Sequence, residues 1–219
     1  MRTEFEREEF AQLLPDGLAM AETALSIAAI SDRVDLLSGE EKAELSPMAP
    51  KRQAGFSSGR YCAARAQSLL KRDPEPILRE ERTPIWPQGL WGSITHTEHI
   101  AAAMVSSVRS VGIDLEELDR MHEGLHKTLF TENELVALAN YSVGADTIMF
   151  SAKEAGYKAI YPVGKKFIGF HEAEIELDES SQTFKIRYVG DHEPNKALNS
   201  GEGRWAIALD HVFTFFQLG

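Results

Sequence analysis

The order of helix and strand patterns constrains the fold of this 219-residue chain most strongly. Residues 46–71 predict a helix that begins with Ser46 and Pro47, and residues 100–105 and 111–116 then predict two strands. Further helices are expected over 121–129, 132–140 and 146–161, and further strands near 172–177, 184–189 and 204–216. Because these patterns contain no repeated strand–helix–strand unit, they predict an α+β fold rather than a doubly wound parallel sheet.

Local signals place several helix ends. Ser38 with Glu41, and Thr131 with Glu134, each form the pattern of a capping box, which marks the start of a helix. The helix predicted over 146–161 is expected to end before Pro162, because proline lacks the N–H group that a helix interior needs.

Glycine, proline and aromatic residues mark loops and contacts. Gly55 and Gly59 weaken the helix pattern of 46–71 but would allow a neighbouring element to approach closely. The segment 73–93 contains four prolines and two tryptophans, and it is expected to be an ordered loop. Four aromatic residues are expected in the core, namely Trp91, Phe130, Phe150 and Phe167.

The charge balance excludes some classes of partner. Acidic residues outnumber basic residues by 34 to 23, and the net charge of −11 argues against a general binder of nucleic acid or anionic membranes, which needs a basic face. The one cysteine, Cys62, cannot form an internal disulfide, which suits a reducing compartment. We find no signal-peptide pattern at the start and no apolar stretch near the roughly 20 residues of a membrane span. We therefore expect a cytoplasmic protein without a membrane span.

Two acidic residues end the strand pattern at 111–116, whose sequence is VGIDLE. Because side chains alternate along a strand, Asp114 and Glu116 share one face, with Cα atoms about 6.6 Å apart, while apolar residues share the other. A divalent ion could bridge the two carboxylates, and Mg²⁺ prefers such oxygen ligands together with the phosphate oxygens of a substrate. The same pattern also fits a solvated sheet edge, so a second feature is needed to choose.

The second feature is the helical segment 150–159, FSAKEAGYKA. Glu154 and Lys158 lie four residues apart and share a helix face, where they could present a third carboxylate and a cation to the same ion and phosphate cluster. The alternative is an ordinary surface ion pair, worth roughly a few tenths of a kcal/mol. Alanine and glycine make this helix slim, however, which favours close packing beside another element over display to solvent.

Together the two segments resemble the signature of 4′-phosphopantetheinyl transferases. GIDLE at 112–116 matches the G-x-D-x-E strand of that family, and FSAKEAGYK at 150–158 matches its W/F-x-x-K-E-A-x-x-K helix. WPQGLWGSITHT at 86–97 and KRQAGFSSGRYCAARAQSLL at 51–70 are similar to two further family segments. The pattern is most similar to the enterobactin synthase component D branch of the larger, surfactin-type class.

The resemblance implies a Mg²⁺-dependent transfer of 4′-phosphopantetheine from coenzyme A to a serine of an apo carrier protein, with release of adenosine 3′,5′-bisphosphate. Asp114, Glu116 and Glu154 match the metal-binding carboxylates of the family, and Asp114, Glu154 and Lys158 are expected to be catalytic. Either Glu154 or a metal-linked water would accept the serine proton. Lys158 would hold the diphosphate of coenzyme A and stabilise the leaving group.

Other basic residues are expected to bind coenzyme A. Arg52 and Arg60 lie eight residues apart on the predicted helix, slightly more than two turns, so they can flank one anion. The resemblance identifies that anion as the 3′-phosphate of coenzyme A, and it assigns Thr95 and His96 to its phosphate groups. Lys153 is expected to contact phosphate or pantetheine, although its helix position turns it partly off the face of the catalytic pair.

The fold that the resemblance implies consists of two similar α+β halves in a pseudo-twofold arrangement, here residues 1–108 and 109–219. The first half would supply the nucleotide contacts, and the second would supply the metal site and the phosphate-binding helix. A chain that contains both halves is expected to act as a monomer.

The expected partners are apo acyl or peptidyl carrier proteins of nonribosomal peptide, siderophore or polyketide synthesis. Two alternatives stay open: the same reaction on the fatty-acid acyl carrier protein, and a noncatalytic module that binds coenzyme A or a nucleotide. An acidic chain needs a local apolar or basic patch to bind an acidic carrier, and the sequence does not locate such a patch.

Overall fold

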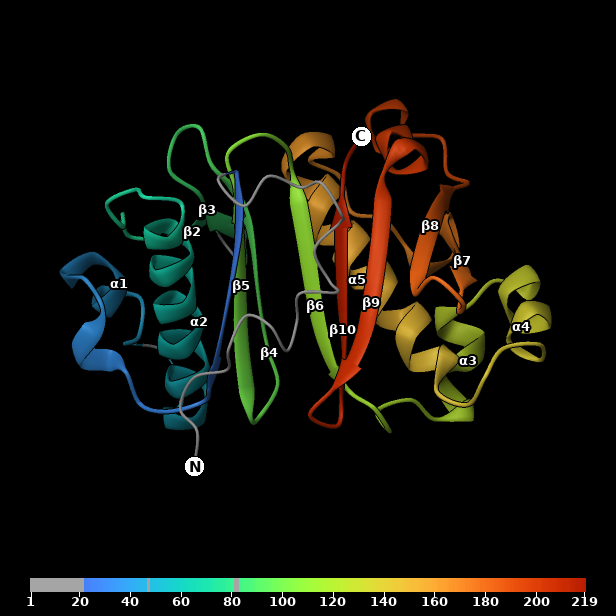
Figure 1. Cartoon of the computed structure of the whole chain (residues 1–219), viewed down its shortest axis with the longest axis horizontal. Helices are drawn as coiled ribbons and strands as arrows, with labels where there is room; N and C mark the ends of the chain where they lie inside the picture. The colour runs from blue at the N-terminus through green and yellow to red at the C-terminus, as the bar shows by residue number, and fades with distance from the viewer. Residues whose placement is uncertain (1–21, 47, 81–82) are drawn as a thin grey trace. The chain divides into compact units, whose positions relative to one another are not determined.

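The computed structural model describes residues 22–46, 48–80 and 83–219, whose helices and antiparallel sheets confirm the predicted α+β fold (Figure 1). The described residues fall into two compact units, 22–108 and 109–219, which are here named unit 1 and unit 2. Each unit packs one long helix against an antiparallel sheet.

Unit 1 contains a three-stranded antiparallel sheet with the strand order β1-β5-β4. Its elements are β1 (Thr23–Ala29), β4 (Trp91–His96), β5 (Ile100–Ser106) and the long helix α2 (Pro50–Leu69). Helix α2 packs on all three strands, and small side chains permit a close contact: a Cβ atom added to Gly59 would lie 2.8 Å from Ile94 Cγ2. The prediction that the glycines of this helix allow a close approach is confirmed.

Two short helices, η2 (Val34–Leu36) and α1 (Gly39–Ala43), precede α2. Ser38 caps α1: its Oγ accepts a hydrogen bond from Glu41 N (3.1 Å), and its own N–H donates to Glu41 Oε2 (3.0 Å). The predicted capping box is therefore confirmed.

Helix α2 begins later than predicted. Ala49 is extended, with ψ at 151°, and Pro50 takes the first helical position, so the helix does not include Ser46. Pro47 lies outside the described residues. Strand β1 has no counterpart among the predicted elements, although almost all of its residues are buried.

The expectation of a loop over residues 73–93 is wrong. The segment contains a short antiparallel pair, β2 (Leu78–Glu80) and β3 (Thr83–Ile85), and the first residues of β4. Pro84 is compatible with this pair because both strands of a two-stranded sheet are edge strands, where proline is tolerated.

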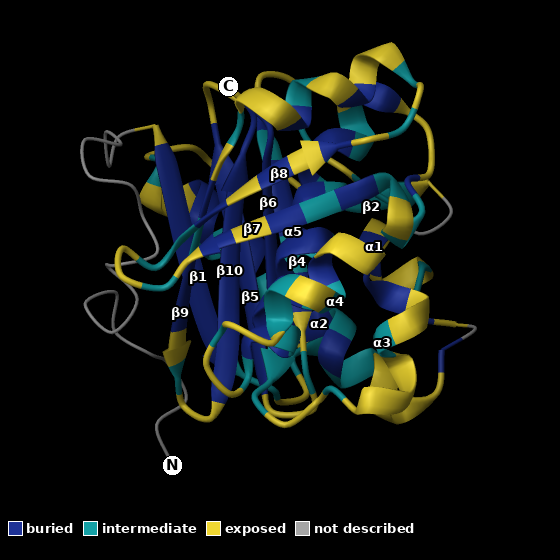
Figure 2. Ribbon diagram, turned by 90° about the vertical axis from the view of Figure 1, so that its right-hand side faces the viewer, coloured by how far each residue is buried: buried dark blue, intermediate teal, exposed yellow. Residues whose placement is uncertain are grey.

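Unit 2 contains a five-stranded antiparallel sheet with the strand order β6-β10-β9-β8-β7. Its strands are β6 (Val111–Glu117), β7 (Ala173–Asp178), β8 (Thr183–Tyr188), β9 (Glu202–Ala208) and β10 (His211–Gln217). Its helices are α3 (Glu123–Leu129), α4 (Glu132–Leu138), α5 (Ala145–Gly164), η3 (Phe170–Glu172) and η4 (Glu193–Ser200). Strand β10 is buried along its whole length, between β6 and β9 (Figure 2).

Helix α5 packs closely on β6 and β10. The alanines that face the sheet, Ala152, Ala155 and Ala159, are fully buried. A Cβ atom added to Gly112 of β6 would lie 1.9 Å from the carbonyl oxygen of Ala155, so only glycine allows this contact. The prediction that the slim helix packs beside another element is confirmed.

The far end of α5 differs from the prediction. The helix continues through Pro162 to Gly164, because proline removes only one N–H donor while Lys165 N still donates to Tyr161 O (2.9 Å). Lys165 then adopts a left-handed conformation, with φ at 51°, and ends the helix.

The remaining predicted elements of unit 2 match with small shifts. Thr131 caps α4, with Glu134 N donating to Thr131 Oγ1 (3.3 Å), as the capping-box pattern predicts. The strand pattern over 204–216 contains two strands, because Leu209 and Asp210 both have positive φ angles (54° and 59°) and form a tight hairpin turn.

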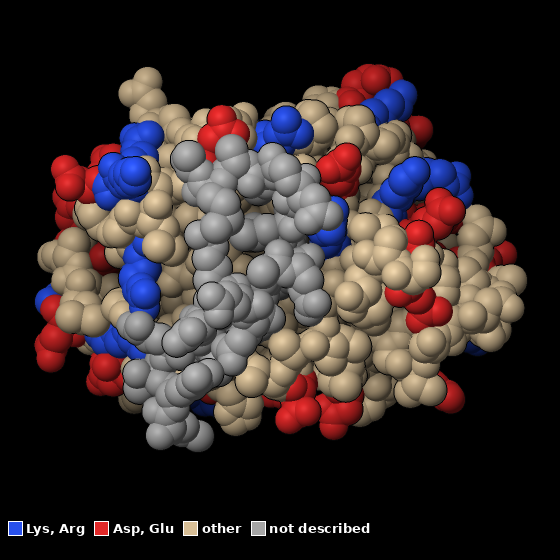
Figure 3. Space-filling model, viewed as in Figure 1, with Lys and Arg blue, Asp and Glu red and all other residues tan. Residues whose placement is uncertain are grey.

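The surface carries mixed charges. Figure 3 shows Lys and Arg side chains in separate groups among Asp and Glu side chains on the face in view, without a continuous basic surface. Within the part of the chain that the structure describes, no helix is long and apolar enough to cross a membrane.

Candidate active site

Asp114 lies at the centre of the polar residues between β6 and α5 in unit 2. It is 5% exposed and sits opposite Thr214 in the register of β6 with β10. Lys158 Nζ donates to Asp114 Oδ1 (2.6 Å), and Ser151 Oγ donates to Asp114 Oδ2 (3.0 Å). The strand and the helix that the sequence singled out therefore meet at Asp114.

Ser151 and Thr214 belong to this site, although sequence reasoning missed them. Their hydroxyl oxygens lie 2.9 Å apart, and Thr214 Oγ1 also donates to Ser151 O (3.0 Å). Ser151 stands about two helical turns before Lys158, which places both on one helix face. That spacing could have indicated Ser151, whereas Thr214 comes from a strand 100 residues after Asp114 and gives no such signal.

The other two carboxylates are electrostatically coupled to Asp114. Burial, and then the nearby carboxylate of Asp114, raise the pKa of Glu116 to about 7. The same two causes, in the same order, raise the pKa of Glu154, while Lys158 opposes them. Glu116 Oε2 also lies 3.6 Å from Arg120 Nε. The three predicted metal ligands therefore lie near one another and repel one another when ionised.

The chemistry of this donor set fits a magnesium ion. Three carboxylates supply only oxygen ligands, and the charge of Asp114, which adds to burial in raising the pKa of Glu116 and of Glu154, causes a repulsion that a cation would relieve. Lys158 supplies a positive charge beside Asp114. Among the described residues, however, no three His, Cys, Asp or Glu side chains are close enough together to hold a metal ion as they stand.

A cavity of about 170 Å³ adjoins Glu154 in unit 2. Its walls are mainly apolar and come from α5, the segment 167–170, β7, β8 and η4. Phe167, which was expected in the core, is 67% exposed and packs edge-on against Tyr157, with ring centroids 5.6 Å apart. The cavity therefore places apolar surface beside a carboxylate whose pKa is raised.

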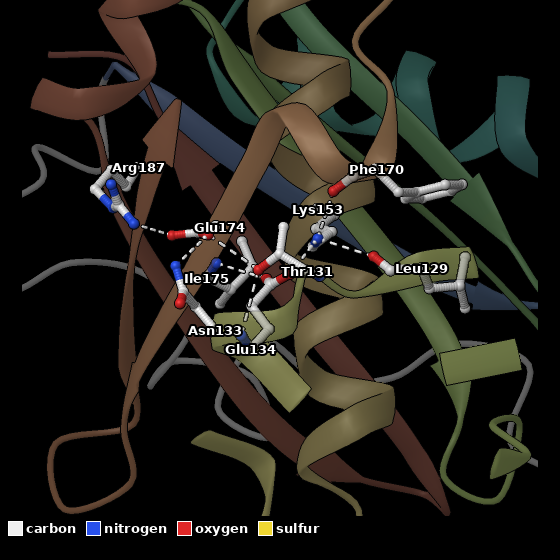
Figure 4. Close-up of polar contacts among 9 residues, drawn as sticks. All are labelled: Leu129, Thr131, Asn133, Glu134, Lys153, Phe170, Glu174, Ile175 and Arg187. Atoms are coloured by element: carbon white, nitrogen blue, oxygen red, sulfur yellow. Dashed lines mark hydrogen bonds and ion pairs between the residues drawn. The ribbon is translucent and has the colours of Figure 1, made fainter. Parts of the chain in front are cut away.

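The side chain of Lys153 does not make its polar contacts at the site of Glu154 and Lys158. Its ammonium group is buried and donates to Glu134 Oε2 (2.7 Å) and to two backbone carbonyls, those of Leu129 and Phe170 (Figure 4). Burial lowers the pKa of Lys153, and Glu134 opposes this shift. The expectation that Lys153 contacts phosphate is not supported, because its three N–H donors point into the protein. Its expected contact with pantetheine stays a prediction, since Lys153 also lines the cavity beside Glu154.

In unit 1, His96 lies against helix α2. A Cβ atom added to Gly55 would lie 3.0–3.2 Å from ring atoms of His96, and Arg52, one turn before Gly55, is exposed. Since Ile94 and His96 both face α2, alternation along β4 turns Thr95, which is 7% exposed, to the opposite face of the sheet. Within unit 1, His96 therefore lies against α2 one turn after Arg52, and Thr95 is on the other side of β4.

Arg60 is placed differently from Arg52. It is 8% exposed, its Nη2 lies 3.9 Å from Glu44 Oε2, and its guanidinium carbon lies 4.4 Å above the ring of Phe56. Burial lowers the pKa of Arg60 to about 10, with Glu41 and Glu44 opposing the shift. Eight residues exceed two turns by about 80°, so the two arginines diverge, and the prediction that they flank one anion is not supported.

Comparisons with known proteins cover both units. A family model described as the 4′-phosphopantetheinyl transferase N-terminal domain matches residues 20–106, and a model of the 4′-phosphopantetheinyl transferase superfamily matches residues 110–210. The chain is 35% identical over 215 residues to the 4′-phosphopantetheinyl transferase Svp of Streptomyces mobaraensis. The aligned region covers 93% of this chain and 87% of that protein.

Two further relatives support the same family. The chain is 33% identical to the 4′-phosphopantetheinyl transferase PptT of Mycobacterium tuberculosis, over 82% of this chain and 85% of that protein. It is 34% identical to enterobactin synthase component D of Escherichia coli, over 57% of this chain and 63% of that protein, which supports the predicted branch. The strand and helix that meet at Asp114, the two family models and these relatives agree: the chain belongs to the 4′-phosphopantetheinyl transferase superfamily.

Proposed function

We propose that Asp114, Glu116, Glu154 and Lys158 form the site at which this 4′-phosphopantetheinyl transferase acts on coenzyme A. As a member of its family, the chain transfers 4′-phosphopantetheine from coenzyme A to a serine of a carrier protein, as in nonribosomal peptide and siderophore synthesis, and releases adenosine 3′,5′-bisphosphate. The observation that carries the site assignment is the part-buried contact between Lys158 and Asp114, which joins the helix and strand of the family signature.

The proposed roles follow from the charges of the site. The three carboxylates would hold Mg²⁺, which supplies a positive charge that polarises the attacked phosphorus and neutralises the departing oxygen. Glu154 accepts the proton of the carrier serine as its oxygen bonds to phosphorus, since a raised pKa makes a carboxylate a better general base. Lys158 stabilises negative charge on the leaving phosphate as the phosphorus–oxygen bond breaks.

The cavity beside Glu154 supports a place for part of the pantetheine arm. Its walls are mainly apolar, and Glu154 itself contributes to them. A flexible substrate arm that enters this cavity would lie next to the proposed base without competing for the carboxylates. We assign this contact to unit 2, with Tyr157 and Phe167 at the wall.

We assign the nucleotide end of coenzyme A to unit 1. This follows the expectation that residues 1–108 supply the nucleotide contacts and residues 109–219 supply the metal site. Exposed Arg52, and His96 against α2, are the candidates for the 3′-phosphate, because a guanidinium and an imidazole can donate to phosphate oxygens. Thr95 stays a candidate from the other face of β4. Arg60 is assigned to the buried cluster with Glu44 instead.

We also infer a monomer in a cytoplasmic, reducing compartment. Both family models match within one chain, which supports a complete site in a monomer. Cys62 is a fully buried free thiol, which suits a reducing compartment.

The test is incubation of the protein with coenzyme A, Mg²⁺ and a panel of apo carriers, followed by mass spectrometry. The panel contains peptidyl and acyl carriers of secondary metabolism and a fatty-acid acyl carrier protein, each with a control in which the acceptor serine is alanine. We expect the mass of phosphopantetheine on carriers of secondary metabolism. Modification of the fatty-acid carrier alone would favour that substrate, and coenzyme A binding without modification of any carrier would indicate a noncatalytic module.

A further inference from the structure

Lys153 makes its polar contacts inside unit 2, one residue before the proposed base. Its ammonium donates to Leu129 O (2.9 Å), Glu134 Oε2 (2.7 Å) and Phe170 O (2.6 Å), which uses all three of its N–H donors (Figure 4). The side chains of Lys153 and Glu134 are each 3% exposed. The lysine therefore ties α5 to the end of α3 and to η3.

Glu134 extends these ties to two more elements. Its Oε2 accepts from Thr131 N (2.8 Å), which closes the capping box of α4, and its Oε1 accepts from Ile175 N (2.8 Å) at β7. One carboxylate thus satisfies a helix cap, a strand amide and the lysine of α5. A buried charge of this kind is stable only while its partner remains, so Lys153 and Glu134, here named the Lys153 cluster, hold these elements together.

Two parts of the proposed site depend on the Lys153 cluster. Glu154 follows Lys153 directly, so the anchor on Lys153 fixes the rotation of the helical turn that carries the base. Phe170, whose carbonyl accepts from Lys153, also lines the cavity beside Glu154. A change in the Lys153 cluster would shift both the carboxylate and the wall of the cavity.

We propose that Lys153, together with Glu134, is a positioning residue that fixes Glu154 and the cavity wall for phosphopantetheine transfer, and that its ammonium does not bind phosphate. The proposal rests on the proposed function of the Glu154 site. It deepens that function because it assigns part of the catalytic geometry to a buried ion pair whose ammonium is fully hydrogen-bonded within unit 2.

The geometry favours this role over phosphate binding. To reach a phosphate, the ammonium of Lys153 would have to give up three hydrogen bonds and leave a carboxylate buried without its counter-ion. Lys158, on the neighbouring face of the same helix, is 28% exposed at its side chain and already contacts Asp114. The cation available to the substrate is therefore Lys158.

The test compares Lys153→Met and Glu134→Gln in the full chain, with Lys185→Met, an exposed lysine of β8, as the matched control. Carrier modification gives kcat and KM for coenzyme A at about 15 °C, thermal unfolding gives the folded fraction, and calorimetry gives Mg²⁺-dependent binding of coenzyme A. Glu134→Gln keeps the approximate shape of the side chain and does not alter the cavity lining, so it tests the ion pair without removing a residue of the cavity wall. The folded fraction accounts for the backbone hydrogen bond that the amide cannot accept.

We expect both cluster variants to lower kcat about tenfold or more per folded molecule and to raise KM for coenzyme A by about threefold or more, because Glu154 is also a proposed metal ligand. Both should also lose Mg²⁺-dependent affinity for coenzyme A. The kcat of the double variant should be no lower than that of the slower single variant, because both changes remove the same ion pair. Lys185→Met should behave as the wild type does.

Three outcomes would overturn the proposal. A raised KM with unchanged kcat in Lys153→Met, together with normal kinetics in Glu134→Gln, would identify a phosphate ligand. Normal kinetics per folded molecule in both variants would show a role in stability alone. If the wild type modifies no carrier, the proposed function fails, and calorimetry then tests the positioning role of Lys153. That role would be overturned if both variants bound coenzyme A with wild-type affinity, or if neither the wild type nor the variants bound it.

Discussion

At the scale of single residues, Asp114 connects the chemistry of the site with its packing. It accepts hydrogen bonds from Lys158 and Ser151, and its charge is one cause of the raised pKa values of Glu116 and Glu154. After burial, which is the larger cause, the charge of Asp114 disfavours the ionised forms of the other two carboxylates, and a cation would relieve this repulsion. The residue that the sequence singled out for metal binding thus also sets the electrostatics of its neighbours.

The role of Glu154 as a base gives the first prediction. Glu154→Gln should lower kcat by about 10² or more, because a positioned general base contributes in the range of about 10²–10⁴. The thermal midpoint of unfolding should change little, since the amide replaces a half-buried carboxylate whose charged form burial disfavours. Rates of carrier modification measure the effect, with Glu176→Gln, an exposed residue of β7, as control. A rate equal to that of the control would contradict the assignment.

The thiol of Cys62 gives a second prediction. Burial raises the pKa of Cys62 to about 12, so at pH 8 only about one thiol in ten thousand is ionised in the folded protein. A disulfide reagent at pH 8 should therefore react with Cys62 only after denaturant is added. Without denaturant, the reaction of Cys62 with the reagent should accelerate as the pH rises toward 12, because a larger fraction of the thiol is then ionised. Fast modification of the native protein at pH 8 would show that the thiol is accessible.

At the scale of elements, the capping-box patterns predicted two helix starts correctly, whereas the start of α2, the end of α5 and the short strands differ from the prediction. The capping boxes at Ser38 and Thr131 were correct because their bonds lie within four residues. The predicted end of α5 was wrong, since the helix continues two residues past Pro162 to Gly164. The β2–β3 pair was missed because proline suggested a loop, whereas its pairing depends on segments that sequence periodicity does not connect.

The contact between β6 and α5 gives the third prediction. Gly112→Ala should lower the free energy of unfolding by about 2–4 kcal/mol, because its Cβ atom would meet the carbonyl oxygen of Ala155 at 1.9 Å and backbone atoms cannot move aside easily. Gly124→Ala in α3 is the control, since no atom lies within 4 Å of its added Cβ. That variant should be neutral or more stable by up to about 1 kcal/mol. Urea denaturation followed by circular dichroism measures both, and equal midpoints would refute the close contact.

At the scale of the whole molecule, the two family models and the two compact units describe the same chain from sequence and from structure. The models match residues 20–106 and 110–210, and the described residues divide after Val108. The acidic net charge of −11 explains why a diphosphate needs help to approach the site. Mg²⁺ and coenzyme A should therefore bind together better than either binds alone.

This coupling gives the fourth prediction. Coenzyme A with Mg²⁺ should raise the thermal midpoint of the full chain, with a stabilisation of about 2.7 kcal/mol at 100 times the dissociation constant. Chelation of the metal should remove most of the shift. Glu116→Gln should remove it as well, because one proposed ligand is lost, whereas Glu176→Gln should keep it. A shift in Glu116→Gln equal to the wild-type shift would exclude Glu116 from the metal site.

The sequence by itself determined the α+β class, the family, the alternation that places Asp114 and Glu116 on one face, and the helix face shared by Glu154 and Lys158. These features depend on periodicities within a few residues, which one chain segment carries alone. Only the tertiary structure decided that Ser151 and Thr214 join Asp114, that Arg60 is buried beside Glu44, and that Lys153 points into the protein. Such placements depend on which element packs against each face, and that contact comes from residues distant in the chain.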